Sequence, residues 1–262
     1  MSPSTHRHGE ARLFRRWWFS KGMRPAAPAA GGPSRREARA RRALALGEWE
    51  ALREHLRKVA AERVTAAGAV FRAAELDLPA GEPAARRAYQ WALEAYEAAG
   101  RLLDHAGDED TDLPDLAAAV VLAEQSVERL AAAHLLHAGR RPDPPAVRCY
   151  WNPLHGPAEP APGPAGNRRN RKRAHVTARE AAADRRPTCR SCRAAILAGQ
   201  QPDVLPALLP AKAAPGRKGP LLVPYFAVPR QWSPWSTTAC GAYDPDTPAL
   251  VLRGEHRRPG PR

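Results

Sequence analysis

Between residues 34 and 139 the apolar positions recur every three or four residues in three successive stretches. That spacing places the apolar side chains on one face of an α-helix and predicts three amphipathic helices. Short segments rich in glycine, proline and acidic residues separate them. Pro83 stands in the first turn of the second helix, where its missing N–H costs nothing. The three stretches cover residues 45–73, 85–103 and 113–137.

The narrow apolar seams and the short connections indicate how these helices pack. Seams with a period near 3.5 residues are typical of coiled-coil packing, and short turns make successive helices antiparallel. We therefore predict a mainly α protein built on an antiparallel helical hairpin or three-helix bundle. Leu44, Leu46 and the pair Val121-Leu122 fall outside the seams. They leave self-association of the bundle open.

The chain changes character after residue 140. Of its 28 prolines, 21 lie beyond that point, and this density excludes a large regular fold there. The first 33 residues combine Arg, Gly and Pro without a sustained period, which predicts disorder. The predicted organisation is a disordered basic tail over residues 1–33, the helical bundle over 34–139, a Pro-rich, loop-rich zinc-knuckle-like module over 140–245 and a second disordered basic tail over 246–262.

Three of the four cysteines and one histidine have the spacing of metal ligands. Cys149 and His155 lie in a segment, residues 149–157, whose Asn-Pro and Gly-Pro pairs favour tight turns. Cys189 and Cys192 are separated by two residues, a gap that lets two thiolates of one turn reach one ion. Three thiolates and one imidazole complete a tetrahedral shell with no position for water. We therefore predict a structural zinc site formed by Cys149, His155, Cys189 and Cys192.

The spacing leaves two other arrangements open. Cys240 is an alternative fourth ligand if His155 serves only as a turn residue. A catalytic zinc held by the other three cysteines would instead leave His155 free as a general base and make the protein an enzyme. The sequence contains no Gly-rich phosphate loop, nucleophile elbow or His-Glu-x-x-His motif. We therefore expect a non-enzymatic scaffold or interaction protein that binds a protein partner.

Positive charge is concentrated towards the two ends of the chain. The net charge is +14, with +9 over residues 1–42, −7 over 43–140 and +12 over 141–262. Five cations stand within six residues between His155 and Cys189 and can neutralise several phosphates, which makes nucleic-acid binding the alternative function. This basic run consists of Arg168, Arg169, Arg171, Lys172 and Arg173.

No stretch of the sequence has the length and apolarity of a membrane span. The longest apolar run covers residues 116–123, well short of the roughly 20 residues that a bilayer requires. No apolar core of a signal peptide is present either. We therefore expect a cytoplasmic protein. The Arg-Trp cluster around Trp17-Trp18 leaves contact with a membrane surface open.

One segment carries a resemblance to known proteins. From Cys149 to Pro157 the chain reads Cys-Tyr-Trp-Asn-Pro-Leu-His-Gly-Pro, and an Ala-rich helical hairpin precedes it. Over residues 40–245 it resembles a group of uncharacterised actinobacterial proteins that pair such helices with a Cys-aromatic-x-Asn-Pro-x-His-Gly-Pro box. The resemblance implies this architecture and no reaction, because the group has no assigned activity. In that group the second cysteine motif follows the box sooner, so the Arg-rich stretch is an insertion here.

Overall fold

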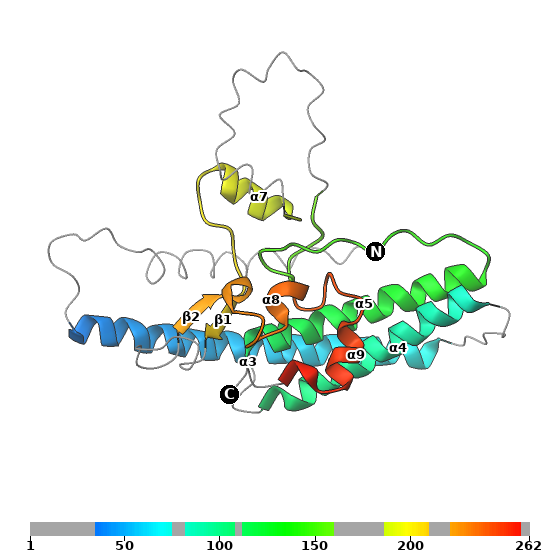
Figure 1. The fold of residues 1–262 in the computed structure, drawn as a ribbon, viewed down its shortest axis with the longest axis horizontal. Helices are drawn as coiled ribbons and strands as arrows, with labels where there is room; N and C mark the ends of the chain where they lie inside the picture. Colours follow the sequence, from blue (N-terminus) through cyan, green and yellow to red (C-terminus); the bar gives the residue numbers. More distant parts are fainter. Residues whose placement is uncertain (1–34, 75–81, 108–111, 160–185, 210–220, 258–262) are drawn as a thin grey trace, which may run out of the picture.

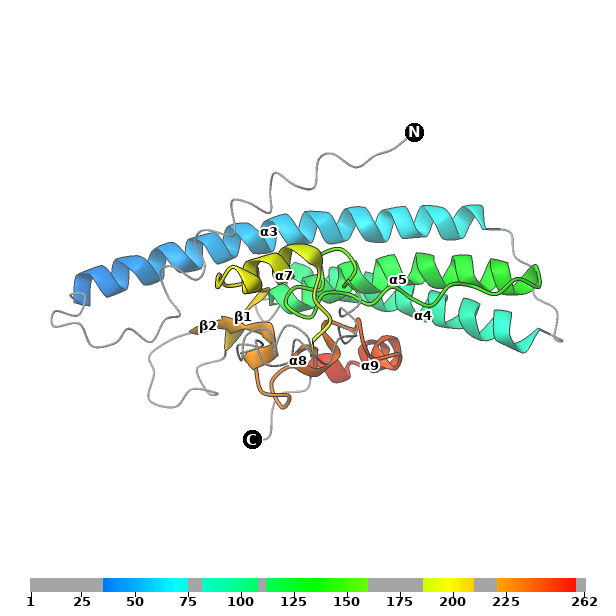
Figure 2. The same cartoon turned by 90° about the horizontal axis from the view of Figure 1, so that it is seen from above.

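Three long helices dominate the structure, which is a computed structural model. It describes residues 35–74, 82–107, 112–159, 186–209 and 221–257, so the predicted N-terminal tail lies outside the described residues. The long helices are α3 (Arg35–Ala73), α4 (Pro83–Asp104) and α5 (Leu113–His137). They lie side by side, and each runs antiparallel to the one that follows it along the chain, so that α3 and α5 run parallel (Figure 1, Figure 2). The predicted mainly α fold with a three-helix bundle is confirmed.

Helices α3 and α4 approach each other closely at Gly68. A Cβ atom built on Gly68 would lie 2.5 Å from the hydroxyl oxygen of Tyr96 and 3.3 Å from its Cζ. The Tyr96 ring packs against Phe71 of α3, with 5.2 Å between the ring centroids. The missing side chain lets the two helices meet here, which accounts for a glycine inside α3 despite its cost to helix stability.

Gly68→Ala is expected to lower the free energy of unfolding by about 1 kcal/mol, because the added methyl group overpacks the contact with Tyr96. The matched control is Gly100→Ala in α4, whose added Cβ meets nothing within 4 Å and which should stabilise the protein by roughly 0.5–1 kcal/mol. Urea denaturation measures both changes. In a Tyr96→Phe background the cost of Gly68→Ala should shrink, and an unchanged cost would contradict this account.

The C-terminal half contains short elements joined by irregular chain. β1 and β2 pair antiparallel, with Pro206 opposite Pro224 and Leu209 opposite Leu221. Strand β2 ends at Pro224, and a 3-10 turn follows it. The short elements of the C-terminal half are α7 (Arg190–Leu197), β1 (Pro206–Leu209), β2 (Leu221–Pro224), η4 (Tyr225–Ala227), α8 (Trp235–Thr238), α9 (Thr247–Leu252) and η5 (Glu255–Arg257). One further 3-10 turn, η1 (His105–Gly107), ends α4 in the bundle.

Helix α5 lies at the centre of the molecule. Residues 116–123 are all buried, not only those on the predicted seam, as expected for a helix that is apolar on every side. Leu122 lies beside Gly241 of the C-terminal half. Val121 and Leu122, which we considered as surfaces for self-association, are therefore inside the core, whereas Leu44 of α3 is 49 % exposed.

The main hydrophobic core draws on both halves of the chain, so residue 140 does not separate two independent cores. The cysteine-containing segments form a second, smaller cluster of their own. Figure 1 shows α7 lying apart from the three long helices, above them in that view. The C-terminal residues buried in the main core include Leu205, Ala207, Tyr225, Val228, Trp235, Ala239, Cys240 and Val251.

The stretch predicted as a disordered C-terminal tail is folded over most of its length. Helix α9 lies against α4. The indole of Trp91 donates to the carbonyl of Pro245 at 2.7 Å, and the guanidinium of Arg101 donates to the carbonyl of Leu252. This corrects the predicted tail from residue 246. The apolar stretch is too short to show a period, and a helix of that length needs tertiary packing to form.

Two half-buried carboxylates join the start of α5 to the C-terminal half. Asp112 accepts a hydrogen bond from the backbone N–H of Leu208 in β1 at 2.8 Å, and Asp115 accepts one from the indole of Trp235 in α8 at 2.7 Å. The same two carboxylates form a capping box at the start of α5. Burial and the neighbouring charge of Asp115 raise the pKa of Asp112 to about 7. The C-terminal half is thus hydrogen-bonded to the bundle.

Candidate metal centre

The first two candidate ligands are brought together by a tight loop. An antiparallel bridge pairs Arg148 with Pro157. Within the loop, the side-chain oxygen of Asn152 accepts a hydrogen bond from the backbone N–H of Leu154 at 3.1 Å. The backbone carbonyl of Asn152 accepts one from the backbone N–H of His155 at 3.0 Å. Asn-Pro favours this kind of turn. The loop reverses the chain and brings His155 back beside Cys149, as the turn residues predict.

The other two candidate ligands stand at the start of α7. Cys189 is the N-cap residue and Cys192 lies in the first turn. The positive end of a helix favours thiolates. This turn is joined to the loop through the backbone, because Tyr150 donates to the carbonyl of Pro187 at 2.7 Å and Glu159 donates to that of Thr188 at 3.1 Å.

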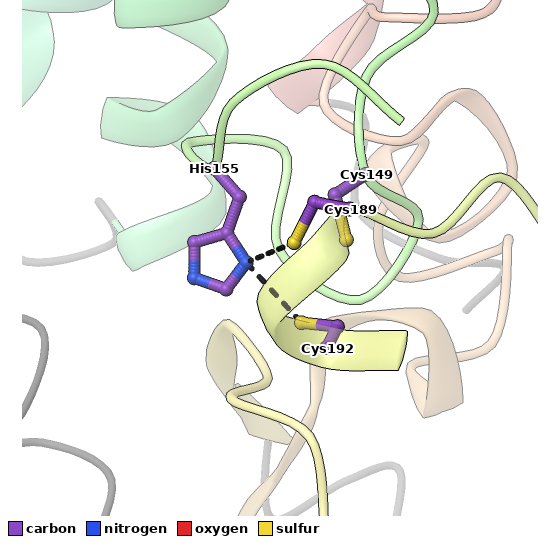
Figure 3. Close-up of side chains that lie close together, drawn as sticks. All are labelled: Cys149, His155, Cys189 and Cys192. Carbon is purple, nitrogen blue, oxygen red and sulfur yellow. Dashed lines mark hydrogen bonds between the residues drawn. The ribbon is translucent and has the colours of Figure 1, made fainter. Parts of the chain in front are cut away.

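The four side chains converge on one point (Figure 3). Their ligand atoms all lie within 4.8 Å of one another, close enough to bind a metal ion. Nδ1 of His155 lies 3.3 Å from Sγ of Cys192 and 3.5 Å from Sγ of Cys189. In a tetrahedral zinc site the sulfur and nitrogen ligand atoms are about 3.5 Å apart. We call Cys149, His155, Cys189 and Cys192 the Cys3His cluster.

A carboxylate that the sequence analysis missed holds the histidine in place. Oδ2 of Asp203 lies 3.0 Å from Nε2 of His155, on the side of the ring away from the cysteines. In metal sites such a partner fixes the ring orientation and leaves the other nitrogen free to bind the ion. No spacing rule connects Asp203 with His155, so only the tertiary structure identifies it.

Proton positions in the cluster follow from these contacts. Burial lowers the pKa of His155, but hydrogen bonds with Asp203 and with the cysteines outweigh it and raise the pKa to about 11. Hydrogen bonds from Cys149 and Cys192 hold the pKa of Cys189 well below its usual range. The cluster is therefore a set of anionic and proton-bridged donors in which a divalent cation would replace the protons.

Asp203→Asn is expected to lower the metal affinity of the cluster roughly 10- to 100-fold, because the imidazole loses the acceptor that orients it. Competition with a chelating dye measures the affinity. The control is Asp143→Asn, which removes an exposed carboxylate from the segment leading into the loop. Equal affinities for the two variants would show that Asp203 does not support the cluster.

The remaining predicted site residues lie elsewhere. Cys240, the alternative fourth ligand, is buried in the main core and not in the second cluster. Its burial and the nearby charge of Asp115 raise its pKa well above the usual range. His155 lies with the other three cysteines instead. The basic run, Arg168, Arg169, Arg171, Lys172 and Arg173, lies outside the described residues.

A nearly buried arginine anchors the cluster to the bundle. Arg148 directly precedes Cys149, and its guanidinium donates to Glu124 of α5 at 2.8 Å and approaches Glu128 at 3.5 Å. Glu124 also pairs with Arg63 of α3 at 3.2 Å. One carboxylate therefore links two long helices to the residue next to a candidate metal ligand.

An aromatic layer covers one side of the cluster. Trp151 packs against the cysteines, and its indole donates to the hydroxyl of Thr188 at 3.3 Å. Phe226 lies against Tyr150 and Trp151, with 5.1 Å and 5.7 Å between ring centroids. The hydroxyl of Tyr225 donates to the carbonyl of Tyr150. Tyr225 and Phe226 are thus joined to the cluster through Tyr150 and Trp151.

Comparisons with known proteins found no relative of this chain. No protein-family model matches the chain, and searches of curated proteins and of solved structures found no match either. Among the residues that the structure describes, no helix combines the length and apolarity needed to cross a bilayer. The geometry of the Cys3His cluster is therefore the feature that points to a function.

Proposed function

We propose that the chain is a non-enzymatic interaction protein in which one structural zinc ion organises the cysteine-containing segments on a helical bundle. The single observation that carries the proposal is the convergence of three thiols and one imidazole, with ligand atoms all within 4.8 Å. Sulfur-rich tetrahedral donor sets of this kind select zinc. The surface that the bound ion keeps in a fixed conformation then binds the partner.

The donor set favours a structural role for the ion over a catalytic one. A catalytic zinc keeps one position open for water. The alternative with His155 as a free base requires the imidazole to point away from the cysteines, yet Nδ1 lies 3.3 Å from Sγ of Cys192 while Asp203 holds Nε2. With four donors converging, the ion is enclosed.

Metal content per chain tests the proposal. Protein purified without added metal should contain about one zinc, and a Cys189→Ser/Cys192→Ser variant should contain none. Substitution by cobalt then reports coordination, because a tetrahedral thiolate site gives intense visible absorption. Absence of metal from the wild-type protein would overturn the proposal. A cobalt spectrum of a five-coordinate site with exchangeable water would favour the enzyme alternative.

We also propose two further expectations from the sequence, the relationship to actinobacterial proteins and the cytoplasmic location. The residues from Cys149 to Pro157 support the likeness to the actinobacterial proteins. The cytoplasmic location likewise stays a prediction from the sequence. The sequence also predicts nucleic-acid binding through the basic run and the Arg-rich tails, and the described residues add a separate observation that bears on it.

A further inference from the structure

An exposed arginine is stacked on the aromatic layer beside the Cys3His cluster. The guanidinium carbon of Arg186 lies 4.3 Å from the ring centroid of Tyr150, 5.6 Å from that of Trp151 and 5.7 Å from that of Phe226. Its backbone carbonyl accepts from the hydroxyl of Thr188 at 2.7 Å, which fixes the residue next to the rings. Arg186 is exposed, and the three rings are only partly buried.

From this arrangement we infer that Arg186, Tyr150, Trp151 and Phe226 form a contact surface for single-stranded nucleic acid. Proteins that bind single strands combine cationic groups along the backbone with aromatic faces on which bases stack. A guanidinium lying flat on a ring keeps its N–H edge free for phosphate. The four residues supply both kinds of contact at one place.

Charge decides between nucleic acid and a cationic protein segment as the occupant. The same rings could hold a cation from a partner protein, since Arg186 already occupies that place. Residues 141–262 carry a net charge of +12, however, and the basic run precedes Arg186 along the chain. This charge repels a cationic segment and attracts a polyanion. The surface therefore favours nucleic acid.

The inference rests on the proposed zinc site, because Tyr150 and Trp151 follow directly after Cys149 and are positioned by the same loop. Bases need exposed stacking partners held in fixed positions. Loss of the ion would release the rings along with the loop. Zinc content therefore has to be measured on every variant, so that failure of the metal site and failure of the binding surface can be told apart.

The test is fluorescence anisotropy of the full chain with a labelled oligothymidylate of about 15 nucleotides, at about 50 and about 200 mM salt. Arg186→Ala should weaken binding roughly tenfold. Phe226→Leu, which keeps the charge and removes a ring, should also weaken it. The matched control is Arg190→Ala: Arg190 is exposed in α7 and stacks on no ring among the described residues. The loss of affinity caused by Arg190→Ala should be smaller than that caused by Arg186→Ala, and it should decrease at the higher salt concentration.

Several outcomes would overturn the inference. One is a wild-type protein with its zinc that does not bind the oligonucleotide at low salt, which would leave the proposed zinc site intact. Another is equal weakening by Arg186→Ala and Arg190→Ala with no effect of Phe226→Leu, which would assign binding to charge alone. A third is preference for an arginine-rich peptide over the oligonucleotide. Oligonucleotide binding by wild-type protein that contains no zinc would overturn the dependence on the metal site.

Discussion

Cys192→Ala is expected to remove the metal and to unfold the segments around the Cys3His cluster while the three long helices stay paired. The second hydrophobic cluster consists of three cysteines with Trp151 packed against them, too little apolar surface to hold a fold without a further constraint. In small zinc modules the ion supplies about 10 kcal/mol of apparent folding free energy. Amide hydrogen exchange should therefore show lost protection in residues 149–159 and 186–203, with α4 and α5 unchanged.

The matched control is Cys240→Ala, which removes another fully buried thiol. Cys240 lies in the main core, so this variant should keep its zinc and lose only stability that is shared by the whole protein. A chelator added to wild-type protein should reproduce the Cys192→Ala pattern. Unchanged protection of the cluster segments after metal removal would show that packing alone holds them.

Glu124→Gln is expected to lower the free energy of unfolding by about 2–3 kcal/mol, because it leaves a buried guanidinium without its charged partner. The side chain of Arg148 is only 9 % exposed, and its shorter ion pair, at 2.8 Å, is with Glu124. The substitution also weakens the pair with Arg63 of α3. Chemical denaturation measures the loss, and hydrogen exchange should place it between α5 and the metal centre.

Glu128→Gln provides the comparison for this ion pair. Glu128 approaches the same guanidinium at 3.5 Å and is 45 % exposed, so its contribution is that of a surface pair, below about 1 kcal/mol. High salt should reduce the effect of Glu128→Gln and leave most of the effect of Glu124→Gln. Equal losses of unfolding free energy in Glu124→Gln and Glu128→Gln would show that the burial of Arg148 does not strengthen its ion pair with Glu124.

The predictable parts of the structure are those specified locally. The three helices follow from apolar spacing over long stretches, and Pro83 and Gly139 mark ends where the structure has them. Positive φ at Gly139, 68°, is a conformation that glycine adopts without strain. The candidate metal site could also be predicted from the sequence, because the Cys-x2-Cys spacing and the Asn-Pro turn position the candidate ligands through residues that are near in the chain.

The missed features depend on contacts between distant residues. Asp203 meets His155 across 48 positions and Glu124 meets Arg148 across 24. Neither carboxylate differs from others in the sequence by composition or spacing. The short helix α9 was also missed, since it gains stability from Trp91 and Arg101 of α4.

The sequence by itself determined the helical bundle, the donor types of the metal centre and the excess of positive charge, because each depends on periodicity, spacing or counting along the chain. Only the tertiary structure decided that His155 and not Cys240 completes the cluster. It also decided that the C-terminal half shares the main core and that Arg186 stacks on Tyr150. The physical reason is that burial and long-range pairing are set by how the helices and loops pack together, and no local pattern records that packing.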